Sequence, residues 1–283
     1  MAEPAHSRRT LLAEASARLG AAGLEQPRRE AVRAWNDLAG SPHRAVLDPS
    51  EPVEEALASS YRAAIARRAA GEPLAHATGW TGFRHLTLRA DRRALIPRPE
   101  TEGLVERVLG RIRIGRVADI GTGSGCIGLS LAQEGSYEQV VGVERSVDAL
   151  GLAVVNRALV QGRLELIQGD LSSPLASASL DALVSNPPYL TSGEYAVLDP
   201  SVKAWEPESA LAAGPDGMDA IRRLLADGRR VVKPGGWLVL EVDATRAGRC
   251  ARHAAGSGWT DVVIEADLFG RERYLLARRS DAE

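Results

Sequence analysis

The first part of the chain repeats hydrophobic side chains at the spacing of an α-helix. Side chains three and four positions apart share one helical face. Three such groups are present: Leu11, Leu12, Ala15 and Leu19; Val32, Trp35 and Leu38 after Pro27; and Val53, Leu57, Tyr61 and Ile65. The pattern therefore predicts a small all-helical domain over residues 1–75, with a loop at residues 40–50.

The pattern changes over residues 76–96, where hydrophobic and polar positions begin to alternate. The markers of this segment are Gly79, Gly82, Leu86, Leu88 and the pair Leu95-Ile96. Alternation next to glycines predicts a short β-hairpin, which we interpret as a linker. The next segment, Pro97-Arg98-Pro99-Glu100, has the prolines and the acidic residue that favour the first turn of a helix.

From residue 116 onward, short hydrophobic runs alternate with helical segments. Five runs are typical of β-strands: Val117–Ile120, Val140–Val143, Leu164–Ile167, Leu180–Ser185 and Trp237–Val242. Strands that alternate with helices predict a parallel sheet with helices on both of its faces. Two later runs, Val262–Glu265 and Arg273–Ala277, predict an antiparallel hairpin at one edge. We therefore expect an α/β fold for a second domain over residues 97–283.

Composition and charge narrow the class of protein. The 283 residues are 45% hydrophobic and 25% charged, which is typical of a globular protein. No stretch reaches the roughly 20 apolar residues of a membrane span. Only Cys126 and Cys250 are present, too few for a disulfide scaffold or a cysteine-rich zinc site, so we expect a cytoplasmic protein without a membrane partner. A net charge of −2 argues against a large basic surface for nucleic acid.

A glycine-rich loop follows the first predicted strand. Val117–Ile120 runs directly into Gly121-Thr122-Gly123-Ser124-Gly125, and a helical segment comes next. Glycines permit a tight turn and let the backbone approach a ligand at the N-terminus of a helix. A turn without a ligand is the alternative, but three alternating glycines directly after a strand favour a nucleotide-type site.

Two acidic residues at later strand ends would complete such a site. Glu144 ends the second strand about 20 residues past the loop, where a carboxylate accepts hydrogen bonds from both ribose hydroxyls. Asp170 ends the third strand and is a candidate for the adenine amino group, with a plain turn as an equal alternative. NAD and S-adenosylmethionine both carry an adenosine, so these residues do not distinguish them.

The segment Asn186-Pro187-Pro188-Tyr189 follows the fourth predicted strand, at the edge of the sheet where ligands bind. Prolines fix the backbone and remove N–H donors, so acceptors remain. The Asn186 side-chain oxygen and the Pro187 carbonyl would each accept one N–H of a planar NH₂ group, and Tyr189 would stack on its plane. These bonds favour the positive charge that develops during methyl transfer. The alternative is a rigid turn that caps a strand.

Together these residues resemble a known family. Asp119–Gly125 and Ser185–Tyr189 are similar to class I S-adenosylmethionine-dependent methyltransferases that act on planar amino or amide nitrogens. Further stretches resemble the release factor glutamine methyltransferases: Gly71–Leu74, Leu95–Glu106, Glu206-Pro207 with Ala210-Leu211, Gly214–Gly217 and Asp267–Arg273. The resemblance implies a Rossmann-like, seven-stranded class I methyltransferase sheet with a small all-helical N-terminal domain.

The resemblance also implies roles for particular residues. The loop Gly121–Gly125 would hold the methionine part of S-adenosyl-L-methionine, Glu144 would hold its ribose, and Asp119 would also belong to the cofactor site. Asp170 and Leu171 would flank the adenine. The substrate would be bound by Asn186, Pro187, Pro188 and Tyr189; of these, Asn186, Pro187 and Tyr189 would be catalytic, and Asn186 would also touch the cofactor.

The implied reaction transfers a methyl group from S-adenosyl-L-methionine to the side-chain nitrogen of a glutamine and leaves S-adenosyl-L-homocysteine. By resemblance, the glutamine lies in the Gly-Gly-Gln motif of class-1 peptide chain release factors. Residues 1–75 would form a second contact for so large a substrate. We expect no metal site, because the substrate nitrogen attacks the methyl group directly.

Two alternative functions share parts of this pattern. An amino-methyltransferase of adenine or guanine in nucleic acid, or of a ribosomal-protein glutamine, would use the same Asn-Pro-Pro-Tyr segment. The stretch Leu95–Glu102 and the net charge of −2 count against a nucleic-acid partner. A non-catalytic binding module would keep the fold, but the intact glycine loop and Asn186 argue against a loss of activity.

Three residues depart from the family pattern, and one segment carries a further prediction. His76 stands where tyrosine is usual, Asp243 replaces a glycine, and Trp205 precedes Glu206. None of them belongs to the Asn-Pro-Pro-Tyr segment. We expect Arg98, Glu100 and Thr101 to lie beside the methionine end of the cofactor, because a helix N-terminus can face a carboxylate. Packing between domains is the alternative.

Overall fold

A computed structural model of the chain describes residues 7–40 and 52–281. The chain divides into two compact units: residues 1–81 with 200–205, and residues 82–199 with 206–283. Apart from Gly40, the loop expected at residues 40–50 lies outside the described residues. Within the described ranges, no helix has both the length and the apolar character that crossing a membrane requires.

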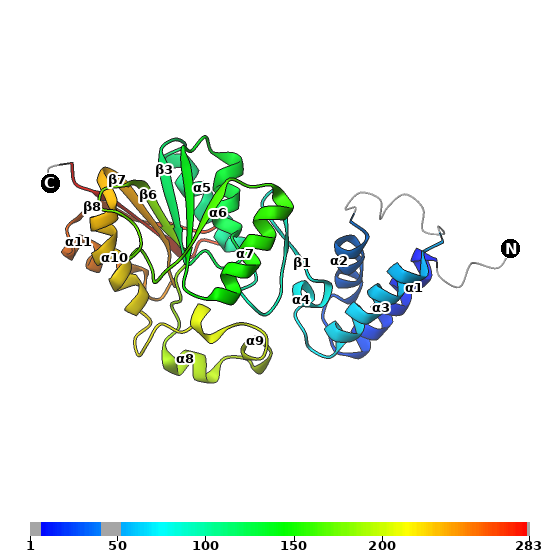
Figure 1. The fold of residues 1–283 in the computed structure, drawn as a ribbon. Helices are drawn as coiled ribbons and strands as arrows, with labels where there is room; N and C mark the ends of the chain where they lie inside the picture. The colour runs from blue at the N-terminus through cyan, green and yellow to red at the C-terminus, as the bar shows by residue number, and fades with distance from the viewer. Residues whose placement is uncertain (1–6, 41–51, 282–283) are drawn as a thin grey trace. The chain divides into compact units, whose positions relative to one another are not determined.

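The first unit is built from helices, as the spacing of its hydrophobic residues predicts (Figure 1). They are α1 (Arg8–Ala21), α2 (Pro27–Ala39), α3 (Glu55–Ala69) and α4 (Leu74–Thr78), with the short α9 (Pro200–Lys203) from later in the chain. Tyr61 is fully buried; its hydroxyl donates to the Ala31 carbonyl at 2.9 Å, and its ring packs against that of Trp35 in a T-shaped arrangement. All three predicted stripes contribute to one hydrophobic cluster, although Val32 is not a member of it.

Two residues that depart from the family pattern, His76 and Trp205, lie close together in this unit. The ring centroids of His76 and Trp205 lie 6.5 Å apart, and His76 is buried. The two substitutions therefore belong to one local packing arrangement.

The second unit contains a seven-stranded sheet, which confirms the predicted fold class (Figure 1). Its strands are β3 (Arg116–Ile120), β4 (Gln139–Glu144), β5 (Leu164–Gln168), β6 (Leu180–Ser185), β7 (Val232–Glu241), β8 (Trp259–Ala266) and β9 (Glu272–Arg279). Their order is β5-β4-β3-β6-β7-β9-β8. The first five in the chain run parallel, and β9 pairs antiparallel with β7 and with the edge strand β8.

Helices cover both faces of this sheet, because successive side chains of a strand point to opposite faces. On β3, Val117 belongs to one hydrophobic cluster and Ala118 to the other. The first cluster includes α5 (Pro99–Arg111) and α6 (Cys126–Glu134), and the second includes α10 (Asp219–Val231) and α11 (Ala247–Gly256). A further helix, α7 (Val147–Val160), buries Ala149 and Leu152 against Ala94. Both faces of the sheet are therefore buried against helices.

The segment between the helical unit and the sheet differs in part from expectation. The hairpin strands are β1 (Trp80–Phe83) and β2 (Leu86–Arg89), so the prediction that Leu95-Ile96 takes part was wrong. Pro97 follows this pair and cannot donate to a strand ladder, and the Ile96 N–H turns to the Glu206 carboxylate at 3.4 Å.

Helix α5 begins at Pro99, two residues later than expected. Arg98 is extended, with φ −101° and ψ 147°, because a residue that precedes proline avoids the helical region. Three elements between β6 and α10 were not predicted: α8 (Ser192–Val197), α9 and the 3₁₀ turn Glu208–Ala210. Strand β7 also begins five residues before the expected Trp237.

Leu183 tests the contribution of this core to stability, because it is fully buried on β6, three residues before Asn186. Leu183→Ala should lower the free energy of unfolding by about 2–5 kcal/mol, since it leaves a cavity in the sheet. Urea unfolding followed by circular dichroism measures the change. Leu268→Ala is the matched control, because Leu268 is 98% exposed, and it should stay within about 0.5 kcal/mol of wild type. Equal losses for both variants would contradict this description of the core.

Candidate functional site

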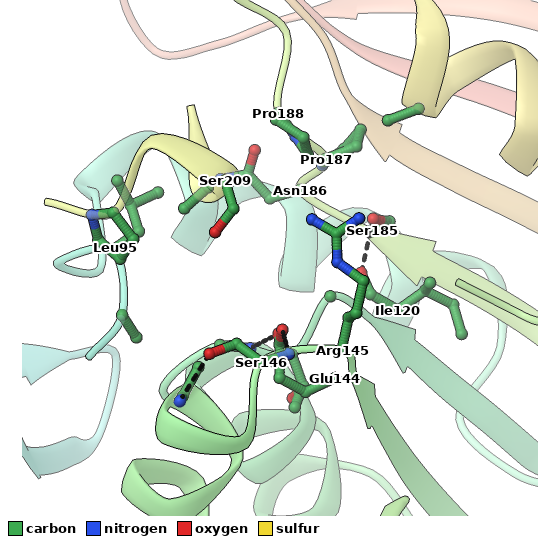
Figure 2. A pocket seen from close by; sticks show the side chains of 18 of the residues that line it. Leu95, Ile120, Glu144, Arg145, Ser146, Ser185, Asn186, Pro187, Pro188 and Ser209 are labelled. Carbon is green, nitrogen blue, oxygen red and sulfur yellow. Dashed lines mark hydrogen bonds between the residues drawn. The ribbon is translucent and has the colours of Figure 1, made fainter. Parts of the chain in front are cut away.

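A cavity of about 320 Å³ lies at the carboxyl ends of β3, β4, β5 and β6 (Figure 2). Its volume falls in the range of roughly 300–1,000 Å³ that is usual for small-molecule sites. The predicted residues that line it are Gly121, Thr122, Gly123, Ser124, Glu144, Asp170, Leu171, Asn186, Pro187 and Pro188. Asp119, Gly125 and Tyr189 do not line it. The fold therefore brings most of the predicted cofactor residues and the start of the predicted substrate segment to one cavity.

The glycine loop needs its glycines for the direction of the backbone. Gly121, Gly123 and Gly125 have φ values of 71°, 55° and 85°, in the left-handed region that other residues rarely adopt. The backbone N–H groups of Gly121 and Thr122 both donate to the Val143 carbonyl, at 2.8 and 3.0 Å. This turn joins β3 to α6 and places loop backbone on the wall of the cavity.

Asp119 holds the glycine loop through hydrogen bonds, although it does not itself line the cavity. Its Oδ2 accepts hydrogen bonds from the Thr122 hydroxyl at 2.5 Å and from the Gly128 N–H at 3.0 Å. Its Oδ1 is buried and has no hydrogen-bond partner among the described residues. Burial raises the pKa of Asp119 to about 7. Asp119 therefore holds the loop in shape from a position behind the wall.

Glu144 links the end of β4 to the glycine loop. One carboxylate oxygen accepts from the Gly123 N–H at 3.0 Å and the other from the Ser146 N–H at 2.8 Å (Figure 2). Each oxygen of an ionised carboxylate has a second lone pair. Glu144 can therefore accept hydrogen bonds from a ligand while it keeps these two.

Asp170 and Leu171 form another part of the wall, after β5. Asp170 Oδ2 accepts from Arg223 Nη2 at 2.6 Å, and Arg223 also lines the cavity. Leu171 has a φ of 50°, which is uncommon for a leucine. Strained backbone of this kind is often found at ligand sites.

Asn186 is held by a hydrogen-bonded pair of side chains from two other elements. Its Nδ2 donates to Thr101 Oγ1 at 3.1 Å, and the Thr101 hydroxyl donates to Glu241 Oε2 at 2.8 Å. Thr101 and Glu241 are each only 2% exposed, and burial raises the pKa of Glu241 to about 7. The Ser185 hydroxyl donates to the Ile120 carbonyl at 2.6 Å and so ties the strand end before Asn186 to β3 (Figure 2).

The segment before α5 reaches the same cavity. Arg98 and Thr101 line it, whereas Glu100 does not. Arg98 Nη2 contacts both carboxylate oxygens of Glu206, at 2.7 and 2.6 Å, and the Glu206 side chain is 2% exposed. Burial raises the pKa of Glu206, while the charge of Arg98 acts in the opposite direction. This ion pair joins two loops that both contribute to the wall, and sequence spacing gave no sign of it.

Tyr189 lies half-buried outside the wall of the cavity. Burial raises the pKa of its phenol, and the charge of Glu241 adds to the effect. The chain after Tyr189 enters α8, which Thr191 and Glu194 start as a capping box. Tyr189 is therefore not among the residues that form the cavity wall, although it directly follows Pro188, which is.

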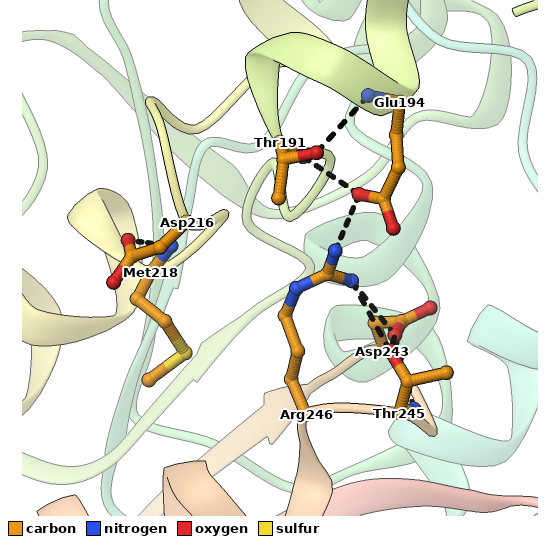
Figure 3. A network of polar contacts seen from close by, with 7 residues as sticks. All are labelled: Thr191, Glu194, Asp216, Met218, Asp243, Thr245 and Arg246. Carbon is orange, nitrogen blue, oxygen red and sulfur yellow. Dashed lines mark hydrogen bonds and ion pairs between the residues drawn. The ribbon is translucent and has the colours of Figure 1, made fainter.

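A polar network joins this following segment to Asp243, another residue that departs from the family pattern (Figure 3). Arg246 donates to Glu194 and, at 2.8 Å, to Asp243, so it joins α8 to the loop after β7. Arg246 and the capping-box contacts lower the pKa of Glu194 to about 2. Asp243 is therefore the partner of Arg246, and none of its hydrogen bonds involves Asn186.

Two family models match most of the chain. Residues 10–79 match the PrmC N-terminal domain, and residues 100–201 match the methyltransferase small domain. A release factor glutamine methyltransferase of Moorella thermoacetica is 40% identical over 282 residues, which cover 96% of this chain and 99% of that protein. The chain belongs to the release factor glutamine methyltransferase family. The family resemblance inferred from the motifs is thereby confirmed.

A second relative of this family supports the same assignment. The release factor glutamine methyltransferase of Deinococcus radiodurans is 38% identical over 279 residues, covering 96% of this chain and 98% of that protein. A methyltransferase structure from Pyrococcus furiosus shares the fold, with a TM-score of 0.52 at 15% identity over 68% of this chain and 88% of that one. The chain is therefore a methyltransferase with the expected Rossmann-like sheet.

The raised pKa of Asp119 predicts a pH-dependent stability. Its folded-state pKa of about 7 lies above the ordinary 3.8, so the folded state keeps a proton that the unfolded chain releases between these values. Wild-type stability therefore falls as pH rises through this window. Asp119→Asn cannot ionise, so its free energy of unfolding relative to wild type should rise from pH 4.5 to 7.5, by about 1 kcal/mol or more.

Urea unfolding at pH 4.5, 6.0 and 7.5 measures this difference. Asp148→Asn, the same change at an exposed position on α7, controls for the removal of a negative charge. If the difference in free energy of unfolding between Asp119→Asn and wild type is the same at all three pH values, then Asp119 does not hold a proton in the folded state near neutral pH.

Proposed function

We propose that this chain transfers a methyl group from S-adenosyl-L-methionine to the side-chain amide nitrogen of the glutamine in the Gly-Gly-Gln motif of class-1 peptide chain release factors. The observation that carries the proposal is Asn186 on the wall of the cavity, with its NH₂ group engaged by Thr101. Its oxygen is left to accept from a substrate N–H. The names of the relatives support the release factor as the partner.

The composition of the cavity wall fits S-adenosyl-L-methionine. The wall offers backbone of the glycine loop, the Glu144 carboxylate, and apolar surface from Leu171 and Ala149. Gly121–Gly125 would hold the methionine part, Glu144 the ribose hydroxyls, and Asp170 with Leu171 the adenine. When bound, this cofactor supplies a methyl group activated by a sulfonium centre, and S-adenosyl-L-homocysteine remains.

Asn186 and Pro187 would hold the glutamine amide by its two N–H groups. The Asn186 oxygen and the Pro187 carbonyl each accept one, so the nitrogen is fixed in orientation and its developing positive charge is stabilised. Pro187 and Pro188 keep the backbone rigid and offer no competing N–H. No strong base is needed, because the nitrogen becomes far more acidic once it carries the methyl group.

The remaining parts of the chain would serve the protein substrate. Tyr189 would stack on the plane of the glutamine amide, and we propose that the helical residues 1–75 bind the body of the release factor. The enzyme would act in the cytoplasm, where release factors work, without a nucleic-acid or membrane partner.

Mass spectrometry tests the proposed reaction directly. The protein is incubated with S-adenosyl-L-methionine and, in separate reactions, with a class-1 release factor, the same factor with its Gly-Gly-Gln glutamine changed to alanine, DNA and RNA. We expect a single added methyl group on that glutamine and none in the other three reactions. Methylated nucleic acid with an unmodified release factor would contradict the proposal. Cofactor binding without any methylation would indicate a binding module.

Glu144 tests the cofactor part of the proposal. Glu144→Ala should weaken S-adenosyl-L-methionine binding by about 1.5–3 kcal/mol, because charge-assisted hydrogen bonds to the ribose are lost. Isothermal titration calorimetry measures the affinity. Glu138→Ala is the matched control, since Glu138 lies just before the other end of β4 and should leave the affinity unchanged. Tight binding of NAD with no binding of S-adenosyl-L-methionine would refute the assignment of the cofactor.

Asn186 tests the substrate part. Asn186→Ala should leave S-adenosyl-L-methionine affinity near the wild-type value while the rate of methyl transfer falls roughly 10²–10³-fold, by analogy with oxyanion-hole deletions. The loss should appear in kcat more than in KM, because the contact stabilises charge that develops in the transition state. If Asn186→Ala instead lowers stability or cofactor affinity, and kcat of the folded, cofactor-bound enzyme is unchanged, then Asn186 only caps its strand.

A further inference from the structure

Three side chains from three separate elements form one hydrogen-bonded series beside the cavity. Glu241 ends β7, Thr101 lies in the first turn of α5, and Asn186 follows β6. The two bonds, 2.8 Å between Thr101 and Glu241 and 3.1 Å between Asn186 and Thr101, meet at one hydroxyl oxygen. Glu241 and Thr101 are buried, so the bond between them is shielded from water, whereas Asn186 is half-buried on the cavity wall.

The chemistry of these groups fixes the direction of both bonds. An ionised carboxylate only accepts hydrogen bonds, so the single proton of the Thr101 hydroxyl points to Glu241. The Thr101 oxygen can then only accept, and Asn186 must turn its NH₂ group toward it. A side-chain amide has one NH₂ group and one oxygen, so the Asn186 oxygen is left on the other side of the amide. The reverse orientation would place two acceptors against each other.

We propose that Glu241 and Thr101 are positioning residues that set the orientation of the Asn186 amide, so that its oxygen and not its NH₂ group meets the N–H of the substrate glutamine. This inference rests on the proposed function. It gives a chemical reason for a carboxylate buried away from the reacting atoms. It also gives Thr101 a role toward the substrate side of the site, beyond the cofactor contact that its motif predicts.

The orientation should depend on the protonation of Glu241. Arg98 and Arg273 favour its charged form, Glu100 opposes it, and burial raises its pKa to about 7. The other titratable groups that interact with its charge are Tyr189, Tyr274 and Cys126. A protonated Glu241 can donate to Thr101, and the Thr101 proton is then free to turn to Asn186. The amide is no longer fixed in one orientation, so activity should rise as Glu241 ionises.

Substitutions at Thr101 separate the hydroxyl from the shape of the side chain. Thr101→Val keeps the shape and removes the hydroxyl, and Thr101→Ser keeps the hydroxyl. We expect Thr101→Val to lower kcat for the release factor about 10–100-fold when S-adenosyl-L-methionine is saturating, because the Asn186 amide loses its alignment. Thr101→Ser should restore kcat to within about threefold. A folded Thr101→Val with wild-type kcat, or a Thr101→Ser as slow as Thr101→Val, would overturn the inference.

The pH dependence gives a second readout that does not need Thr101→Val to fold. Wild-type kcat should rise through about pH 7, and Glu241→Gln should lose this rise because glutamine does not titrate. In ¹H–¹⁵N spectra, the side-chain NH₂ signals of Asn186, assigned by their loss in Asn186→Ala, should shift with the same midpoint in wild type only. Equal titration of wild type and Glu241→Gln would overturn the inference.

The two proposals fail in distinguishable ways. If wild-type protein leaves the release factor unmethylated, the proposed function fails, and the NMR titration still decides whether Glu241 orients Asn186. If wild-type protein methylates the release factor but Thr101→Val is equally fast, the positioning role fails and the proposed function stands.

Discussion

A carboxylate that is buried at the end of a strand needs hydrogen-bond donors, because an unpaired buried charge is costly. Glu241 meets this need through Thr101, which in turn fixes Asn186. The first turn of α5 must therefore lie against the ends of β6 and β7. Two residues favour this placement: Pro99 is the first residue of the helix, and the extended Arg98 before it pairs with Glu206. The family stretch that surrounds these residues thus acts as a local scaffold for one amide group.

The strand order explains why two distant motifs share a cavity. β3 pairs with β4 on one side and β6 on the other, all parallel, so the glycine loop after β3 and Asn186 after β6 emerge at neighbouring positions. The hydrogen bond from Ser185 to the Ile120 carbonyl ties these two strand ends together. A methyltransferase must bind donor and acceptor side by side, and under the proposed function this pair of adjacent strand ends would provide both positions on rigid elements.

Much of the second unit could be predicted because its signals are local. Runs of apolar residues marked the parallel strands, and the glycine loop, Glu144 and Asn186 followed from their positions at strand ends. Contacts between residues far apart in the chain gave no such signal. Thr101 and Glu241 are 140 positions apart, and Arg98 and Glu206 are 108 apart, so only the folded sheet brings them together. The elements between β6 and α10 are too short for a helical period, and the backbone preference before Pro99 displaced the expected start of α5.

The crystal structure of a ternary complex with S-adenosyl-L-homocysteine and a class-1 release factor would show whether Asn186 presents its oxygen to the substrate. We expect the Gly-Gly-Gln glutamine nitrogen within hydrogen-bond distance of the Asn186 oxygen and the Pro187 carbonyl. We also expect Thr101 to bridge Glu241 and Asn186 in the complex, with the homocysteine product against the glycine loop. A glutamine bound away from Asn186, or an Asn186 that turns its NH₂ group to the substrate, would refute the proposed role of Asn186.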